Sequence, residues 1–256
     1  MLTTMGIYMV TAPRNGSKLG TGIEFMKWRT FFYNNDVHKW TLGAETGKGG
    51  YKHWQVRLQI SGSDDEVFNK IKEIFPTAHI EKASDTWSYE CKERMHWTSN
   101  DTPEVLKTRF GHMRWYQKDV IEAVRRQNDR QIAYWYDPEG NKGKSWLVNH
   151  LFESCQAWYV PPTLKTVEGI IQWVASVYIN NDYREILVID IPRSWKWSTE
   201  LYTAIETIKD GLVYDPRYHA QMVNIRGVKI LVLCNHEPKL DALSADRWYA
   251  VAPALT

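Results

Sequence analysis

A tyrosine and a lysine stand three residues apart in the segment 83–94, ASDTWSYECKER, whose pattern predicts a short helix. Residues i and i+3 of a helix share one face, so this spacing would place Tyr89 beside Lys92. A tyrosine can act as a covalent nucleophile once its proton is removed, and a neighbouring ammonium can stabilise the phenolate or a phosphate charge. The pair alone is a weak signal, because Tyr-x-x-Lys recurs by chance in many proteins.

A second group of polar residues lies on a predicted strand. The stretch HWQVRLQI alternates strictly, which places His53, Gln55 and Arg57 on one face and apolar residues on the other. Glu45 ends the preceding predicted strand and could add a carboxylate across the hairpin. One imidazole with oxygen ligands suits Mn²⁺ or Mg²⁺. A polar strip facing solvent is the competing interpretation.

A glycine-containing stretch, YDPEGNKGKSWLV, follows the predicted strand QIAYWY and precedes a predicted helix. Gly143, Lys144 and Ser145 fit the second half of the phosphate-loop pattern G-x-x-x-x-G-K-S/T, and that structural context is the one the pattern requires. Pro138 stands where the first glycine is expected, and Gly140 would take over its turn. Lys144 would reach the phosphates of ATP and Ser145 would hold Mg²⁺. An ordinary charged turn is the competing interpretation.

Two apolar stretches downstream end in polar residues. REILVIDIP places Asp190 at the end of a predicted strand, and VKILVLCN places Asn235 at the end of another. We expect Asp190 to belong to the nucleotide site and Asn235 to contact the γ-phosphate or the attacking water. The residue after Asp190 is Ile191, which is not acidic, so the residue that polarises water is unassigned. LSADRW then supplies Arg247, a candidate arginine finger.

Hydrophobic periodicity predicts the elements that position these residues. The first hundred residues follow the order β-α-β-β-α-β-α, which is the split ferredoxin-like order with one helix added. The polar stretch 93–112 predicts a linker, and 113–129 predicts a helix with an apolar stripe. Short buried strands alternate with helices after that, an α/β pattern. We therefore predict a first domain over 1–100, a linker with oligomerisation helices over 101–130, and a second domain over 131–256. The stripe that would assemble the oligomer consists of Met113, Tyr116, Val120 and Val124.

Composition limits the function classes. With 256 residues, of which 43% are hydrophobic, the chain can bury a sizeable core. It has no apolar run of membrane-spanning length and no pattern of a signal peptide. The net charge of +2 does not by itself announce a nucleic-acid partner. Three widely spaced cysteines predict neither a disulfide framework nor a zinc site, and favour a reducing setting.

Together the motifs resemble those of HUH endonucleases. The first motif is YMVTAPR at 8–14, the second is H-x-Q with His53 and Gln55, and the third is Tyr89-x-x-Lys92. The closest resemblance is to the replication initiators of small circular single-stranded DNA viruses. Gln55 replaces the second histidine of the family name. VTAPR departs from the more common first motif and looks like the version in smacovirus-type initiators.

The resemblance implies both a fold and an activity. The fold would be an α+β ferredoxin-like HUH endonuclease domain followed by an α/β P-loop domain of the AAA+-like superfamily 3 helicase type. The first domain would use Mn²⁺ or Mg²⁺ to nick and rejoin a single-stranded origin hairpin through a 5′-phosphotyrosine at Tyr89. The second would unwind duplex DNA with ATP and Mg²⁺, as a homo-hexamer in which Arg247 reaches a neighbouring subunit.

The same resemblance implies partners and a location. A host polymerase would extend the freed 3′-OH, in the host nucleus if the host is eukaryotic and otherwise in the host cytoplasm. Several basic residues could contact DNA, or they could simply be solvated charges on the surface. A non-enzymatic single-stranded DNA-binding protein or repressor on the same sheet, and an unrelated P-loop ATPase, remain as alternative functions. The candidates for DNA contact are Arg14, Lys209, Arg217 and Arg226.

Overall fold

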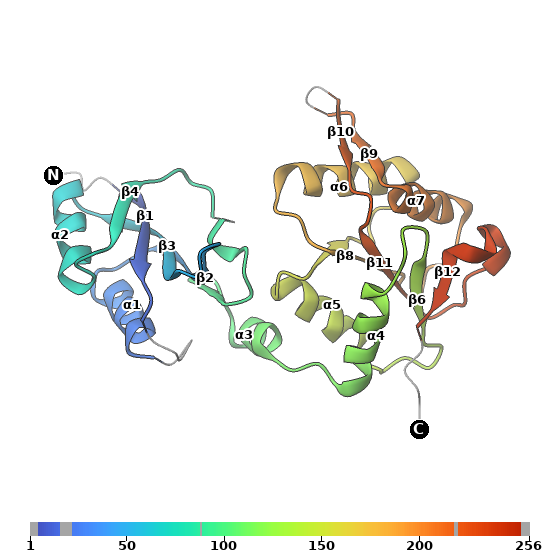
Figure 1. The fold of residues 1–256 in the computed structure, drawn as a ribbon, viewed down its shortest axis with the longest axis horizontal. Helices are drawn as coiled ribbons and strands as arrows, with labels where there is room; N and C mark the ends of the chain where they lie inside the picture. The colour runs from blue at the N-terminus through green and yellow to red at the C-terminus, as the bar shows by residue number, and fades with distance from the viewer. Residues whose placement is uncertain (1–4, 16–21, 88, 218–219, 252–256) are drawn as a thin grey trace. The chain divides into compact units, whose positions relative to one another are not determined.

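The computed structural model describes residues 5–15, 22–87, 89–217 and 220–251. The chain forms two compact units, Met1–Leu106 and Lys107–Thr256, and each has its own five-stranded sheet (Figure 1). The fold therefore mixes helices and strands in both units, as the hydrophobic periodicity predicts. No helix among the described residues combines the length and the apolar character needed to cross a bilayer.

The first unit contains an antiparallel sheet with the strand order β4-β1-β3-β2-β5. Helix α1 follows the first strand and helix α2 follows the third, so the element order is the predicted split βαββαβ order. The bounds are β1 Met5–Pro13, α1 Ile23–Asn34, β2 Lys39–Thr46, β3 Lys52–Ser61, α2 Asp64–Ile74, β4 His79–Lys82 and β5 His96–Thr98.

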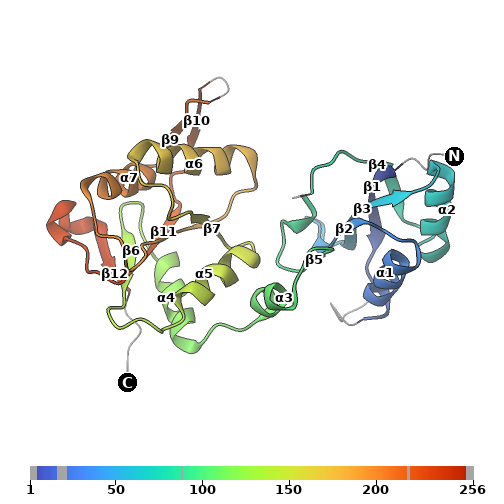
Figure 2. The ribbon, with the colours of Figure 1, turned by 180° about the vertical axis from the view of Figure 1, so that it is seen from behind.

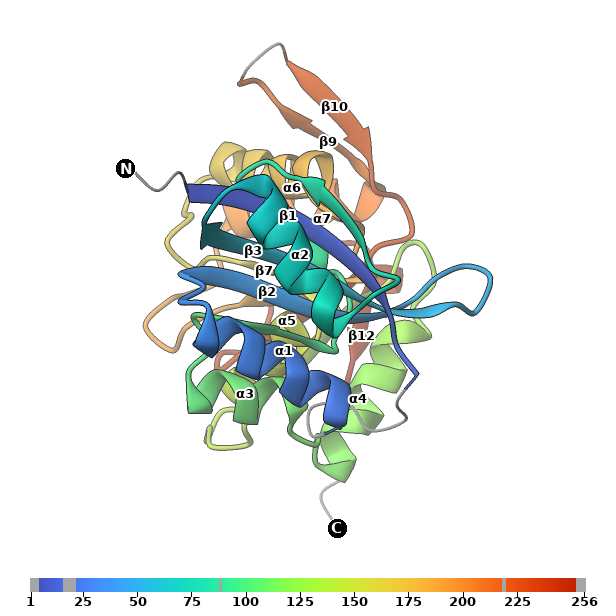
Figure 3. The same cartoon turned by 90° about the vertical axis from the view of Figure 1, so that its left-hand side faces the viewer.

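Both helices of the first unit cover the apolar face of the sheet (Figure 3). Phe25 of α1 packs against Trp54 of β3, and Phe68 of α2 packs edge-on against Tyr8 of β1. Ser63 begins α2 with a capping box in which its hydroxyl accepts the N–H of Glu66. The alternating apolar residues of β3 thus face the helices, and its polar residues face the other side.

The helix predicted for 83–94 is wrong. The described part of this segment forms only a 3₁₀ turn, η1, over Tyr89–Cys91. The turn lies on the polar face of the sheet, where Glu90 is buried against Arg57 of β3. An amphipathic helix buries an apolar face, whereas the buried residue of this turn is the acidic Glu90, which pairs with Arg57 far away in the chain.

The stretch 93–112, predicted as a linker, does contain the boundary between the two units, but it is structured, with β5 and helix α3 (Pro103–Phe110). Pro103 stands at the first helical position, where its missing N–H costs nothing. Thr102 precedes it and accepts the N–H of Val105 through its hydroxyl. These start signals outweigh the weak hydrophobic periodicity of the segment.

The second unit has a parallel sheet with the order β12-β6-β11-β8-β7. Helices α4 and α5 pack on one face of it, and α6 and α7 pack on the other (Figure 2). A two-stranded hairpin, β9 with β10, follows α7. The bounds are α4 Trp115–Arg125, β6 Ile132–Tyr136, α5 Lys144–Glu153, β7 Ala157–Val160, α6 Val167–Asn180, β8 Ile186–Asp190, α7 Thr199–Asp210, β9 Leu212–Asp215, β10 Gln221–Asn224, β11 Lys229–Cys234, η2 Leu240–Ala242, η3 Ala245–Arg247 and β12 Trp248–Ala250.

The apolar stripe of α4 belongs to the core of its own unit. Val120 and Val124 are buried with residues of β6, β11 and α5, and Met113 and Tyr116 pack against the same cluster. The oligomerisation role predicted for this stripe is therefore wrong, because the side chains already cover the unit's own sheet.

Lys209 is an interior residue, which contradicts its predicted contact with DNA. Its side chain is 1% exposed, and the ammonium donates to the Gln127 side-chain oxygen and to the Val228 carbonyl oxygen at 3.3 and 3.0 Å. Burial lowers the pKa of Lys209 to about 8, since the charged form loses its hydration.

The depressed pKa of Lys209 predicts a pH-dependent stability. Between pH 8 and the ordinary lysine pKa the unfolded chain binds a proton that the folded chain does not, so the free energy of unfolding rises with pH. The rise is at most about 1.4 kcal/mol per pH unit. Urea denaturation at pH 7.5 and 9.5 measures it. Lys209→Met should abolish the rise, whereas Lys196→Met, at an exposed lysine, should keep it. Equal slopes for the wild type and Lys209→Met would contradict the interior placement.

Candidate active sites

The pairing of β2 with β3 brings three predicted residues together on the polar face of the first unit. Glu45 is the direct partner of His53 in the ladder, and Gly43 is the direct partner of Gln55. Directly opposed residues of an antiparallel pair have their side chains about 5 Å apart on one face. We call Glu45, His53 and Gln55 the metal set, because the sequence predicted a metal there.

The side chains of the metal set fit a hard divalent cation. His53 Nδ1 lies 3.3 Å from the Tyr51 carbonyl oxygen, and Nε2 lies 3.5 Å from Glu45 Oε2. A proton on Nδ1, donated to that carbonyl oxygen, would leave Nε2 free to bind a metal. Fixing the second ring nitrogen in this way is the usual arrangement of a metal-ligating histidine. Glu45 Oε1 is buried and has no hydrogen-bond partner among the described residues. Gln55 Oε1 accepts the Thr11 hydroxyl at 2.9 Å and retains a second lone pair.

Among the described residues, no group of three or more acidic, histidine or cysteine side chains is arranged to hold a metal ion. The metal set reaches three donors only through the amide oxygen of Gln55. One carboxylate, one imidazole and one amide would leave further coordination positions to water or to a phosphate oxygen, as Mg²⁺ and Mn²⁺ commonly have.

Lys92 connects the tyrosine with the metal set. Its ammonium lies 2.9 Å from Glu45 Oε2 and 4.1 Å from the centre of the Tyr89 ring. Burial lowers the pKa of Lys92, but the hydrogen bond and charge of Glu45 outweigh it and raise the pKa. Lys92 therefore stays charged, beside a tyrosine whose side chain is half exposed.

An ion pair that the sequence did not reveal fixes the 3₁₀ turn η1, which carries Tyr89, on the sheet. Arg57 Nε donates to Glu90 Oε1 at 2.9 Å, and both side chains are almost fully buried. Burial raises the pKa of the Glu90 carboxyl, and Arg57 acts against that shift. Strand alternation does place Arg57 on the face of the metal set, but nothing local indicated its partner 33 residues away.

Arg14 does not lie on this polar face. It follows β1 two residues after Ala12, which pairs with Trp54, and its guanidinium lies over the Trp54 ring at 5.9 Å. The side chain is mostly buried on the helical side of the sheet. This burial argues against the predicted contact of Arg14 with DNA.

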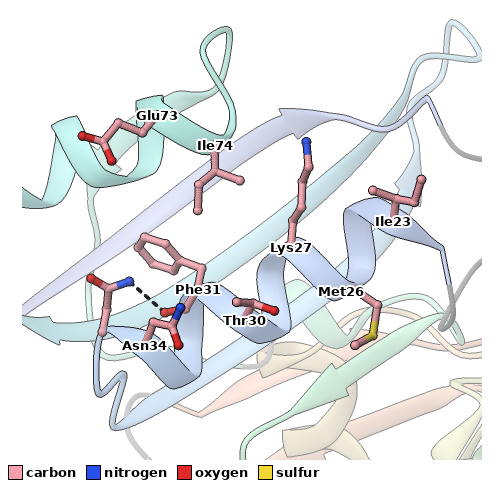
Figure 4. Close-up of a pocket in the computed structure, with 9 residues that line it drawn as sticks. Ile23, Met26, Lys27, Thr30, Phe31, Asn34, Glu73 and Ile74 are labelled. Carbon is pink, nitrogen blue, oxygen red and sulfur yellow. Dashed lines mark hydrogen bonds between the residues drawn. The ribbon is translucent and has the colours of Figure 1, made fainter.

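A hollow of about 620 Å³ also lies on the helical side, beside α1 and α2 (Figure 4). The side chains of Lys27, Phe31 and Ile74 stand around it. Its lining includes the charged side chains Lys27 and Glu73, but the hollow lies across the sheet from the metal set. It is therefore separate from the candidate site.

The phosphate-loop candidate of the second unit has the backbone that its sequence predicts. Gly140 and Gly143 have φ values of 82° and 75°, and Asn141 between them has 65°. Such left-handed residues turn successive N–H groups inward into an anion-binding concavity, and glycine adopts them without strain. Helix α5 begins directly afterwards at Lys144, with Ser145 exposed in its first turn.

Three strand ends bring the other candidates to this loop. Tyr136 of β6 pairs with Cys234 of β11, and Leu233 of β11 pairs with Asp190 of β8, so the ends lie in one row. Asn235 then donates from its side chain to the Asp137 carbonyl oxygen at 2.6 Å. Burial raises the pKa of Asp190, and the Lys144 charge acts against it. This carboxyl edge is where parallel sheets bind ligands.

Asp137, directly before the loop, was not predicted as a site residue. Its carboxylate accepts from the Lys144 ammonium at 2.7 Å and from the Gly140 N–H at 2.9 Å. Burial raises the pKa of Asp137, but these hydrogen bonds outweigh it and leave the pKa below its ordinary value. Asp137 is thus a counter-ion for Lys144, at a position where a nucleotide phosphate would compete for the same ammonium.

Side chains outside the loop hold its backbone. The Tyr116 hydroxyl donates to the Lys142 carbonyl oxygen and the Gln117 amide to the Gly143 carbonyl oxygen, both at 3.1 Å. From the β8 side, Arg193 donates to the carbonyl oxygen of Glu139 at 3.0 Å. Sequence patterns carry no signal for these contacts, because each joins residues far apart in the chain.

Arg247 is buried, which contradicts its predicted role as a finger in a neighbouring subunit. Its guanidinium pairs with Asp210 at 2.7 Å and with Glu206 at 3.4 Å, both in α7 of the same unit. Arg217 and Arg226 are exposed, but each pairs with a carboxylate, Arg217 with Asp215 and Arg226 with Asp129. Their contact with DNA stays a prediction.

Comparison with known proteins gives relatives over most of the chain. The Master replication protein of Subterranean clover stunt virus (strain F) is 28% identical over 94% of this chain and 88% of its own length. The Master replication protein of Faba bean necrotic yellows virus (isolate Syrian SV292-88) is 27% identical over 90% and 78%. Para-Rep C7 of Faba bean necrotic yellows C7 alphasatellite is 22% identical over 77% and 84%. No protein-family model matches the chain.

The motifs predicted a resemblance to viral replication initiators, and the names of these relatives agree with it. The finer likeness to smacovirus-type initiators stays a prediction. This chain is related, over most of its length, to the replication initiators (Rep proteins) of circular single-stranded DNA viruses.

Proposed function

We propose that this Rep-related protein nicks and rejoins single-stranded DNA with its first unit and unwinds duplex DNA with ATP in its second. The observation that carries the proposal is Lys92, whose ammonium touches both Glu45 of the metal set and the ring of Tyr89. A nucleophile candidate, a cation and a donor set for a divalent metal thus occupy one face of one sheet.

The proposed nicking reaction is a transesterification at Tyr89. The Tyr89 oxygen attacks a backbone phosphorus, forms a P–O bond to the 5′ end, and the bond to the 3′ oxygen breaks. The phenol loses its proton and the leaving 3′ oxygen gains one, so the step is balanced and consumes no nucleotide. Lys92 stabilises negative charge on the phenolate or the phosphate. Rejoining is the reverse reaction, in which a 3′-OH displaces Tyr89.

Glu45, His53 and Gln55 would hold Mn²⁺ or Mg²⁺, and the ion would polarise the scissile phosphate. Glu45 would supply the carboxylate ligand, and its Oε2 also accepts the Lys92 ammonium. The protein's own part is to hold the His53 ring against the Tyr51 carbonyl oxygen and to place the Glu45 carboxylate beside it.

In the second unit we propose an ATP site at the loop 137–143. Gly140, Gly143, Lys144 and Ser145 would bind the phosphates and Mg²⁺, with Asp190 and Asn235 at the neighbouring strand ends. The origin hairpin, the host polymerase, a homo-hexamer and a location in the host nucleus, or the host cytoplasm if the host is not eukaryotic, remain proposals from the resemblance.

Tyr89→Phe tests the nucleophile. The change removes only the hydroxyl of a half-exposed tyrosine, so folding and DNA binding should persist while cleavage and a boiling-resistant protein–DNA adduct disappear. A labelled single-stranded oligonucleotide on a denaturing gel measures both. Tyr51→Phe is the matched control, at another exposed tyrosine near the metal set. Normal cleavage by Tyr89→Phe would refute the assignment. DNA binding by the wild type without any adduct would favour a non-enzymatic binding protein.

His53→Ala tests the metal set. Loss of the imidazole should raise the Mn²⁺ concentration needed for half-maximal cleavage by about 10-fold or more, because a ligand is gone. Calorimetric titration of Mn²⁺ checks the same site without activity. His79→Ala, at an exposed histidine of β4, should behave as the wild type. Wild-type Mn²⁺ affinity in His53→Ala would show that the metal is held elsewhere.

Lys144→Ala tests whether the two activities are separable. Removing the ammonium should abolish ATP hydrolysis, since nothing would neutralise the phosphate charge. Cleavage needs no nucleotide and should continue at the wild-type rate. Lys142→Ala, in the same loop, is the control, because Lys142 contacts Tyr116 and Asp137 through its backbone, which the change keeps. Loss of cleavage in a folded Lys144→Ala protein would contradict the separation.

A further inference from the structure

The turn that carries Tyr89 is attached to the sheet through Glu90, the next residue. Tyr89 is 49% exposed, whereas Glu90 is 1% exposed. Because the Tyr89 side chain is half exposed, its own packing does not fix the backbone of the turn. Reaction requires the attacking atom to be held about 3–3.5 Å from its target. The residues that hold Glu90 therefore decide where the tyrosine can act.

Gly43 of β2 lets the turn approach the sheet. A Cβ at residue 43 would lie 2.6 Å from the Glu90 carbonyl oxygen, which is a backbone atom and cannot rotate away. A glycine inside a strand weakens the strand and often marks a site where another backbone comes close. Gly43 is also the ladder partner of Gln55, so the turn lies one strand spacing from the metal set.

Arg57 of β3 fixes the same turn from the neighbouring strand. It shares its face with His53 and Gln55, and its guanidinium reaches both Glu90 Oε1 and the Ser84 carbonyl oxygen. Two N–H donors of this one planar guanidinium therefore restrain the segment on both sides of Tyr89, at Ser84 and at Glu90. The strands that carry the metal set thus carry both attachments of the turn.

We propose that Gly43, Arg57 and Glu90 are positioning residues that set the distance between Tyr89 and the metal set. The inference rests on the proposed function, because it assigns these residues to the nicking reaction. None of the three need touch DNA or metal. Their effect is on the placement of the tyrosine oxygen relative to the scissile phosphate.

Gly43→Ala is the direct test. The new methyl group displaces the turn by about 1 Å, and a misplacement of that size can lower a rate by about 10²-fold. We expect this loss in the single-turnover rate of cleavage at saturating Mn²⁺, on an oligonucleotide that the wild type cleaves. Calorimetric Mn²⁺ affinity and binding of a phosphorothioate oligonucleotide should stay within 2-fold of the wild type. Gly49→Ala is the matched control, since a Cβ there meets nothing within 4 Å.

Glu90→Gln is the second variant. It keeps the shape and one acceptor oxygen but removes the charge that holds Arg57, so cleavage should slow while Mn²⁺ and DNA binding persist. A purely structural role would instead lower cleavage, metal binding and DNA binding together. An unchanged cleavage rate in Gly43→Ala, with the wild-type adduct still lost in Tyr89→Phe, would overturn the positioning role alone. Absence of any adduct in the wild type would overturn the proposed function itself.

Discussion

The antiparallel register between β2 and β3 is the constraint on which the first unit depends. It sets Glu45 opposite His53 and Gly43 opposite Gln55. A shift of one residue would turn all of these side chains toward the helices and expose the apolar set. The apolar residues at every second position of β3, beginning with Trp54, are buried under α1 and α2. Their burial therefore fixes the orientation of the polar face as well as the core. The same register leaves the gap at Gly43 into which the tyrosine turn fits.

A different constraint organises the second unit. Parallel strands end at one edge of their sheet, so the loop after β6 and the polar residues at the ends of β8 and β11 converge there. Asp137 neutralises Lys144 in this arrangement and competes with any phosphate for it. In the first unit, the pairing of two antiparallel strands brings the charged residues together on a sheet face. In the second unit, the ends of parallel strands bring them together at a sheet edge.

Local rules predicted much of this fold from the sequence. Alternation identified β3, and the predicted order β-α-β-β-α-β is the order of β1 to β4 with α1 and α2 in the first unit. The same rules failed where a distant contact decides the outcome. Glu90 forms a turn rather than a helix because Arg57 holds it on the sheet, and no short-range pattern contains that pair. Lys209 and Arg247 look like surface cations, yet partners elsewhere in the unit bury both. Motif spacing therefore located the candidate sites, but not the residues that position them.

The identity of the linked residue is the most direct measure of the account. Trypsin cleaves after Lys82 and Lys92 and releases a peptide, 83–92, with Tyr89 as its single tyrosine. After cleavage of single-stranded DNA, nuclease trimming and digestion, mass spectrometry should find a nucleotide 5′-phosphate on this peptide, and fragmentation should place it on Tyr89. A nucleotide on another peptide, or on Ser84 or Thr86 of this one, would contradict the account, as would cleaved DNA with no linked peptide.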